Sequence, residues 1–225
     1  MAEPMTELMP EPTAEPMRFD DHFRLRLRDL FVWRRDVRRF RRDALPAGTL
    51  ERLIEIACLA PSVGLSQPWR FVVVDDPARR ADVRDAFKAC NADALKSYAG
   101  ELATKYASLK LAGLEEAPCQ FAVFADRTTP VGHGLGRRTM PEMAEYSVVT
   151  AVHTLWLAAR AKGIGMGWVS ILDPDGIAQA LNVPEGWRLI AYLCLGRPAE
   201  THTVPELERV GWEHRQKLEE LLVER

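Results

Sequence analysis

The chain has 225 residues, of which 47% are hydrophobic and 28% charged, with a formal net charge of −2 at pH 7. This length suits one compact domain, and the ordinary apolar content argues against wholesale disorder. The balanced charge gives no global reason to expect nucleic acid or an anionic membrane as a partner. The four cysteines lie far apart and the histidines show no metal-ligand spacing, so we predict no metal site.

The N-terminal residues 1–17 repeat Pro, Glu and Met without a helical or strand period. Such a segment buries too little apolar surface to offset the entropy lost on ordering, so we expect a disordered leader followed by a single domain over residues 18–225. The leader lacks the apolar core of a signal peptide, and no later stretch is as long as a transmembrane span. We therefore expect a cytoplasmic protein without a membrane partner.

The first helix is expected over residues 20–33, with Asp20 or Asp21 as its N-cap. Four apolar side chains share one face of this helix: Phe23, Leu27, Leu30 and Phe31. In chain order, the elements predicted after it are a helix over 46–59, a strand over 70–75, a long helical stretch over 77–117 with a break near 98–100, a strand over 119–125, a helix over 141–162, a strand over 164–171, a short helix from 173, a strand over 188–195 and a final helix over 212–224.

The order of these elements indicates an α+β fold rather than a regular βαβ alternation. The helix over 141–162 is apolar almost all round, so we expect it in the core or in a subunit interface. Gly163 is expected to end that helix, because glycine readily takes the left-handed conformation of a helix C-terminus.

Arg34-Arg35-Asp36-Val37-Arg38 follows the first helix directly and is the first candidate binding motif. The planar, permanently charged fork of arginine suits phosphate, although a solvated basic surface is the alternative interpretation. Asp36 either balances these charges or acts as a general base or proton shuttle beside an anionic ligand.

Two further segments carry residues that suit a flat ligand. The loop over 60–69, A-P-S-V-G-L-S-Q-P-W, combines rigid prolines with small residues that allow close backbone approach, although alone it is merely a tight loop. The run over 163–170, G-I-G-M-G-W-V-S, does not fit the Rossmann pattern G-x-G-x-x-G, and its glycines indicate that something packs against the strand backbone. Ser170 at the end of this run either is satisfied in the core or faces a ligand.

Together these segments resemble the nitroreductase superfamily of FMN (flavin mononucleotide) proteins, over roughly residues 20–215. Members of that superfamily carry R-R-[ST/D]-x-R-x-F, then P-S-x-x-x-x-Q-P-W, a central helix and a G-x-G-x-x-W strand, and all of these occur here in order. The resemblance implies an FMN-binding α+β fold, with a central mixed or antiparallel sheet flanked by helices, and an intertwined homodimer.

Within the superfamily the chain is most similar to the 5,6-dimethylbenzimidazole synthases. Asp36 stands where ordinary nitroreductases carry Ser or Thr, and Leu65 stands where many place a flavin-contacting Asn. In that family reduced FMN is the substrate, and with O2 it is fragmented to 5,6-dimethylbenzimidazole, the lower ligand of cobalamin, and erythrose 4-phosphate. The resemblance also implies a separate NAD(P)H-dependent flavin reductase that supplies the reduced FMN.

The resemblance further implies roles for individual residues. The catalytic residues beside the flavin would be Asp36 and Ser170. The residues that bind the flavin's phosphate, ribityl chain or ring would be Arg34, Arg35, Arg38, Ser62, Leu65, Ser66 and Gly167, with Arg209 as a second phosphate ligand from a partner subunit. Residues 95–117 would form a lid that keeps water out of the pocket.

Two other functions remain open at this stage. An NAD(P)H-dependent nitroreductase or flavin reductase of the same fold would keep its FMN through many turnovers. A flavin carrier without catalysis would bind reduced FMN in air and release it intact.

Overall fold

The computed structural model describes residues 17–225, so the predicted disordered leader lies, except for Met17, outside the described residues. The helices are α1 (Asp21–Trp33), α2 (Thr49–Ala57), α3 (Pro77–Leu95), α4 (Gly100–Ser108), α5 (Met143–Ala161), α6 (Pro174–Ala180), α7 (Glu206–Arg209) and α8 (Leu218–Leu221), with a 3-10 turn η1 (Val63–Leu65). The strands are β1 (Trp69–Val73), β2 (Cys119–Asp126), β3 (Gly165–Val169) and β4 (Trp187–Gly196).

The four strands form one sheet in the order β1-β2-β4-β3, and each neighbouring pair is antiparallel. Phe121 of β2 lies opposite Leu193 of β4, and Met166 of β3 lies opposite Leu195. This sheet, flanked by helices, confirms the predicted α+β fold.

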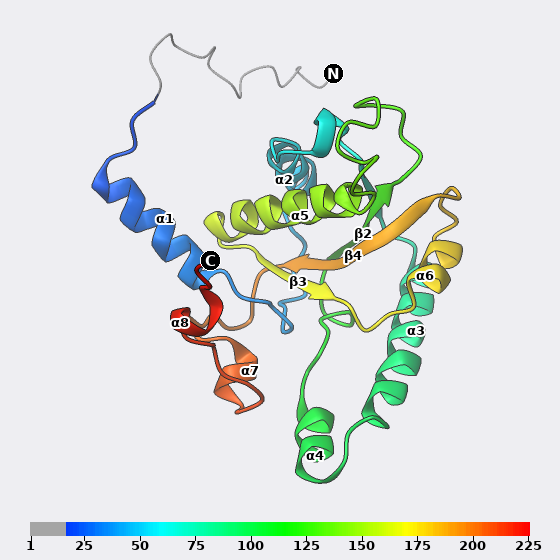
Figure 1. Ribbon diagram of the computed structural model, residues 1–225. Coiled ribbons are helices and arrows are strands. Elements are labelled where there is room, and N and C mark those ends of the chain that lie inside the picture. The colour runs from blue at the N-terminus through cyan, green and yellow to red at the C-terminus, as the bar shows by residue number, and fades with distance from the viewer. Residues whose placement is uncertain (1–16) are drawn as a thin grey trace.

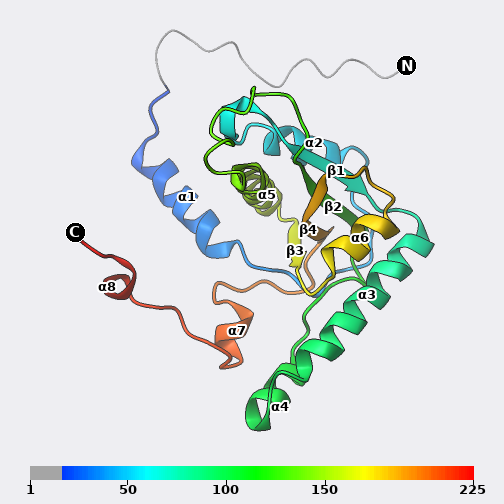
Figure 2. The same ribbon diagram turned by 45° about the vertical axis from the view of Figure 1, so that its right-hand side comes forward.

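Successive side chains of a strand point to opposite faces of the sheet, and here both faces are covered. Phe121 and Val123 belong to a core cluster that includes residues of α2 and α5, whereas Phe124 belongs to a second cluster that includes residues of α3 and α6. Figure 2 shows the resulting three layers, with the sheet between α5 on one side and α3 with α6 on the other.

The central helix α5 was expected in the core or in an interface, and its inner face is buried in the core, including Val148, Val152 and Leu155. Its other face leaves Tyr146 50% exposed. The helix ends before Gly163, which takes a φ of 71°, as expected for the residue after a helix C-terminus.

The predicted stretch over 77–117 is divided as expected, into α3 and α4, but residues after Ser108 are not helical. The predicted final helix over 212–224 is wrong, because only Leu218–Leu221 is helical there. The apolar side chains of this segment, such as Leu222, remain more than half exposed, and a short helix without a packing partner is marginal in water. The turn α7 falls between β4 and this segment, where no helix was predicted.

The chain after α1 is fixed along the outer edge of β3. The Val37 backbone N–H donates to the Met166 carbonyl at 3.0 Å, and the Arg41 N–H donates to the Arg197 carbonyl at 2.8 Å. Phe40 is only 5% exposed, and its ring lies so close to Gly113 that a Cβ there would be 2.3 Å from it. The backbone of this segment is therefore held at a defined place beside the sheet (Figure 1).

The opening helix α1 itself contributes little to the core. The apolar face predicted from its periodicity leaves Phe23 42% and Phe31 46% exposed. Among residues 17–225, no helix combines the length and apolar character that crossing a membrane requires.

Candidate active site

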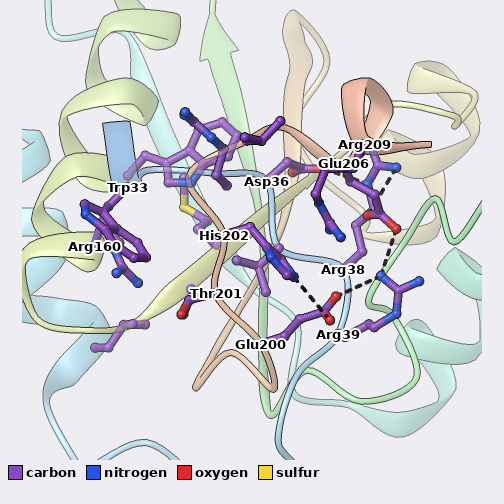
Figure 3. Close-up of a pocket in the computed structure, with 17 residues that line it drawn as sticks. Trp33, Asp36, Arg38, Arg39, Arg160, Glu200, Thr201, His202, Glu206 and Arg209 are labelled. Atoms are coloured by element: carbon purple, nitrogen blue, oxygen red, sulfur yellow. Dashed lines mark hydrogen bonds and ion pairs between the residues drawn. The ribbon is translucent and has the colours of Figure 1, made fainter. Parts of the chain in front are cut away.

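Asp36 lies beside β3 and lines the pocket drawn in Figure 3. Its Oδ2 accepts a hydrogen bond from Arg38 Nε at 2.8 Å, and its Oδ1 accepts one from the Trp168 backbone N–H at 2.9 Å. Burial raises the pKa of Asp36, and the two hydrogen bonds oppose this increase without cancelling it. Such a carboxyl holds its proton more tightly than an exposed aspartate, which is typical of groups that transfer protons in catalysis.

Arg38 links this carboxylate to other parts of the chain. Its side chain is 13% exposed, and its Nη1 donates to the Lys110 carbonyl at 3.1 Å. The same nitrogen lies 3.9 Å from Glu206 Oε2, and Glu206 also accepts a hydrogen bond from Arg39 Nη1 at 2.8 Å. Figure 3 shows these side chains together in the pocket.

Arg34 and Arg35 have different partners. The Arg34 guanidinium carbon lies 4.7 Å from the centre of the Trp156 ring, whereas Arg35 Nε donates to the Thr203 carbonyl at 2.8 Å. Burial, together with the nearby charge of Arg215, lowers the pKa of Arg34. A half-buried cation beside another cation is stabilised when an anion binds between them.

The C-terminal segment brings two more arginines to this site. Arg209 lines the same pocket as Arg35 and Arg38, and Arg215 lines an adjoining pocket together with Arg34. Arg209 was predicted as a ligand from a partner subunit, and in the structure it lies at the pocket of its own chain. The three arginines predicted to hold phosphate are thus brought together around Asp36.

The glycine-rich strand β3 provides the wall beside Asp36. A Cβ on Gly167 would lie 2.2 Å from the Val37 carbonyl oxygen, so packing within the chain already requires glycine there. The predicted role of Gly167 toward a flavin stays a prediction. Ser170 follows β3 and is exposed, ~7 Å of extended backbone beyond Trp168.

The loop over 61–67 has features typical of a ligand site. Ser66 is 1% exposed, and its Oγ has no hydrogen-bond partner among the described residues. Leu65 is 71% exposed, and both Leu65 and Gln67 have positive φ angles, 53° and 43°, which are uncommon for side-chain-bearing residues. Ser62 Oγ accepts the Gln67 backbone N–H at 3.1 Å. A buried hydroxyl without a protein partner, in a loop with two positive φ angles, is typical of a site that hydrogen-bonds a polar ligand.

The structure does not bring this loop next to Asp36. The Val63 N–H donates to Ser147 Oγ at 3.0 Å, which places the loop at the first half of α5. Arg34 instead stacks on Trp156 in the second half of the same helix. The predicted site residues therefore form two groups that a single chain keeps apart.

The predicted lid over 95–117 contains α4, which lies beyond the sheet at the far end of α3 (Figure 1). The Tyr98 and Tyr106 rings stack with centres 4.8 Å apart, and Trp212 meets Tyr98 edge-on at 5.5 Å. The part of the predicted lid that follows α4 contacts the site directly, because Arg38 donates to the Lys110 carbonyl.

The sequence analysis missed Glu206, Arg39 and Arg215 as neighbours of the site. Arg39 belongs to the basic run after α1, and Glu206 and Arg215 belong to the C-terminal segment after β4. No spacing in the sequence indicates which residue of that segment lies near Arg38. Across residues 17–225 no group of three or more His, Cys, Asp or Glu is placed to hold a metal ion.

Comparisons with known proteins identify the family of this chain. The family model described as "Nitroreductase family" matches residues 31–197. A 5,6-dimethylbenzimidazole synthase of Rhodospirillum rubrum is 58% identical over 197 residues, covering 88% of this chain and 93% of the relative. A protein of the same description from Rhodobacter capsulatus is 47% identical, covering 88% and 95%.

Solved structures show the same fold. An iodotyrosine deiodinase bound to FMN and 3-iodo-L-tyrosine superposes with a TM-score of 0.66 at 27% identity, covering 78% of this chain and 91% of that chain. A BluB-like flavoprotein from Clostridium difficile 630 gives 0.65 at 19% identity, covering 88% and 98%. The chain belongs to the nitroreductase family and, within it, to the family of the 5,6-dimethylbenzimidazole synthases.

Proposed function

We propose that this chain fragments reduced FMN with O2 to 5,6-dimethylbenzimidazole and erythrose 4-phosphate. The chain is an enzyme of the 5,6-dimethylbenzimidazole synthase family, and reduced FMN is its substrate rather than a cofactor that is regenerated. The single observation that carries the residue-level proposal is Asp36, a carboxyl of raised pKa held among arginines at a pocket.

The residues present fit an FMN molecule. Arg34, Arg35 and Arg38 surround Asp36 and would bind the phosphate and the ribityl oxygens, with Arg209 as a further phosphate ligand. The phosphate would offset the repulsion among these cations, which is consistent with the lowered pKa of the half-buried Arg34. The unpartnered Ser66 hydroxyl would find a polar partner on the flavin ring.

Asp36 is the proposed proton-transfer residue. Reduced flavin supplies the electrons that activate O2, and a carbon–carbon bond of the ribityl chain breaks during the reaction. Breaking that bond requires removal of a proton from a neighbouring hydroxyl, and a carboxylate with raised pKa is suited to accept it. The hydrogen bonds from Arg38 and the Trp168 N–H hold the Asp36 carboxylate in place while it does so.

Ser170 and the lid complete the proposed site within the chain. Ser170 would donate a hydrogen bond to the flavin ring from the end of β3. The segment over 95–117 would cover the pocket and exclude bulk water, because reactive flavin species decay when they are solvated. Its contact with Arg38 through the Lys110 carbonyl ties this cover to the phosphate-binding arginines.

A homodimer would bring the two groups of site residues together. The loop over 61–67 lies away from Asp36 in its own chain, so Ser62, Leu65 and Ser66 would contact the flavin held by the partner's arginines. The exposed apolar face of α1 and the exposed half of α5 offer the surface that such an interface buries. A separate flavin reductase would supply the reduced FMN.

The proposal is tested by adding reduced FMN anaerobically, admitting air and analysing the mixture by mass spectrometry. One 5,6-dimethylbenzimidazole and one erythrose 4-phosphate per flavin consumed are expected. Intact oxidised FMN with steady NADPH consumption would instead indicate a reductase. Intact FMN without turnover would indicate a carrier.

Mixing two inactive variants tests the shared site. Asp36→Asn removes the proposed catalytic group, and a bulky Ser66→Trp variant blocks the loop. If each site uses one loop and the other chain's Asp36, mixed dimers regain one intact site and form product. Two variants that stay inactive after exchange of subunits, shown by native mass spectrometry, would contradict a shared site.

A further inference from the structure

Glu206 on α7 is a carboxylate to which the proposed reaction gives no role. Its side chain is 14% exposed, and it approaches two arginines, Arg39 at 2.8 Å and Arg38 at 3.9 Å. Arg39 has a second acidic partner in Glu200 at 3.2 Å, and its own side chain is 42% exposed. An ion pair with the exposed Arg39 does not require Glu206 to be buried to this extent, because surface ion pairs form between solvated side chains.

Arg38 connects Glu206 to Asp36. The guanidinium is planar, so its donors point in fixed directions. The Lys110 carbonyl and Glu206 lie at Nη1, and the Asp36 carboxylate lies at Nε. The contacts of Arg38 Nη1 therefore influence the direction in which its Nε points.

We propose that Glu206 is a positioning residue for proton transfer by Asp36, and that it acts by sharing Arg38 with the Asp36 carboxylate, which limits how strongly Arg38 stabilises the charge of Asp36. This inference rests on the proposed function of Asp36. Glu206 reaches the site from the tail, on the same short helix that carries Arg209, so docking of the tail completes the surroundings of Asp36.

The charges around Asp36 agree with this role. Burial raises the pKa of Asp36, the Trp168 N–H and Arg38 lower it, and the negative charge of Glu206 raises it again. The other ionisable groups near Asp36 are Arg34 from its own segment and Cys194 from β4, Arg35 and Arg215 at the adjoining pocket, and Arg160, Glu200, His202 and Arg209 at the pocket of Figure 3. Because Arg38 is shared between two carboxylates, neutralising one of them strengthens its effect on the other.

The test uses Glu206→Gln, which keeps the shape and the hydrogen bond to Arg39 but removes the charge. The acidic limb of its pH profile for 5,6-dimethylbenzimidazole formation is expected at lower pH than in the wild type. Glu206→Asp keeps the charge one methylene farther from Arg38, so its profile should lie between the two. Glu200→Gln is the matched control, because Glu200 shares Arg39 but does not contact Arg38, and its profile should equal that of the wild type.

A second readout does not need turnover. The carboxyl ¹³C resonance of Asp36, assigned with Asp36→Asn, is titrated in the full-length protein, and its midpoint should be lower in Glu206→Gln. Equal midpoints and equal profiles in the wild type and both Glu206 variants would overturn the inference while leaving the proposed function intact. If the wild type forms no product at any pH, the proposed function fails, and the titration still decides whether Glu206 acts on Asp36.

Discussion

Asp126 lies at the end of the inner strand β2, whereas Asp36 lies beside the edge strand β3, and each accepts a hydrogen bond from an arginine. Asp126 ends β2 and accepts from Arg70 at 2.7 Å, from the Thr128 hydroxyl at 2.8 Å and from the Thr128 N–H at 3.0 Å. Burial alone would raise its pKa, but these donors together lower it. At Asp36 burial prevails and the pKa is raised.

The difference teaches what separates a structural carboxylate from a reactive one. Asp126 is 10% exposed and its donors satisfy its oxygens, so its charge is stabilised permanently. Asp36 has fewer donors, shares its arginine with Glu206 and opens into a pocket. A group in that situation retains enough affinity for a proton to exchange it during a reaction.

The largest effect is expected from Asp36→Asn. Asparagine keeps the size of the side chain and the Trp168 contact but cannot accept a proton, so 5,6-dimethylbenzimidazole formation should fall by roughly 10²- to 10⁴-fold. FMN binding should persist, because the arginines remain. Product is measured by mass spectrometry and FMN binding by fluorescence titration.

Asp126→Asn provides the control for this variant. It makes the same chemical change at a carboxylate that lies outside the pocket, and its rate of product formation should match that of the wild type at a temperature where both are folded. Wild-type product from Asp36→Asn would remove the distinction between the two aspartates.

The second-largest effect is expected on the free energy of unfolding, when Asp126 is replaced. Asp126→Ala leaves the Arg70 guanidinium and the Thr128 N–H and hydroxyl without their acceptor, which should cost about 1–3 kcal/mol of unfolding free energy. Chemical denaturation measures this loss. A cost near zero would show that water replaces the carboxylate there and that Asp126 is not structurally required.

Much of the fold could be predicted from periodicity. The nearly continuous apolar run of β2 and the apolar faces of α2 and α5 locate the core because burial of those side chains is a local pattern that the sequence displays. The final helix was mispredicted because Leu218 and Leu222 suggest helical spacing, yet whether a short helix persists depends on a partner surface.

The sequence predicted only those parts of the candidate site whose residues lie close together in one segment. Asp36 and its arginines lie within five residues, and the family pattern identifies them. Glu206 was missed because its approach to Arg38 depends on how the tail folds back, which no spacing encodes. The separation of the Ser62–Ser66 loop from Asp36 depends on which half of α5 each segment packs against, and that too is a tertiary property.

The third prediction uses pH to separate the two aspartates. The folded pKa of Asp36 is raised, so the folded state binds the proton more tightly, and the contribution of this group to stability declines as pH rises from the unfolded pKa through the folded one. Asp36→Asn resembles the neutral form and should therefore be more stable than the wild type at neutral pH. The difference should shrink as the pH falls through the folded pKa.

Asp126 should show the opposite sign. Its folded pKa is lowered, so its stabilising contribution is complete above the unfolded pKa and is lost as pH falls through the folded one. Asp126→Asn should be less stable than the wild type at neutral pH and approach it in acid. Thermal melts of both variants from pH 7 downward measure this, and slopes of the same sign would contradict the assigned pKa directions.

The smallest effect is expected at Asp43, which has two arginine partners. Its oxygens lie 2.9 Å from Arg41 Nε and 3.1 Å from Arg197 Nε, but its side chain is 43% exposed. Water solvates these charges nearly as well as they solvate one another, so Asp43→Asn should cost no more than about 0.5 kcal/mol, and less at high salt. A cost as large as that of Asp126→Ala would mean that the number of arginine partners, and not burial with complete hydrogen bonding, decides how much an aspartate stabilises this fold.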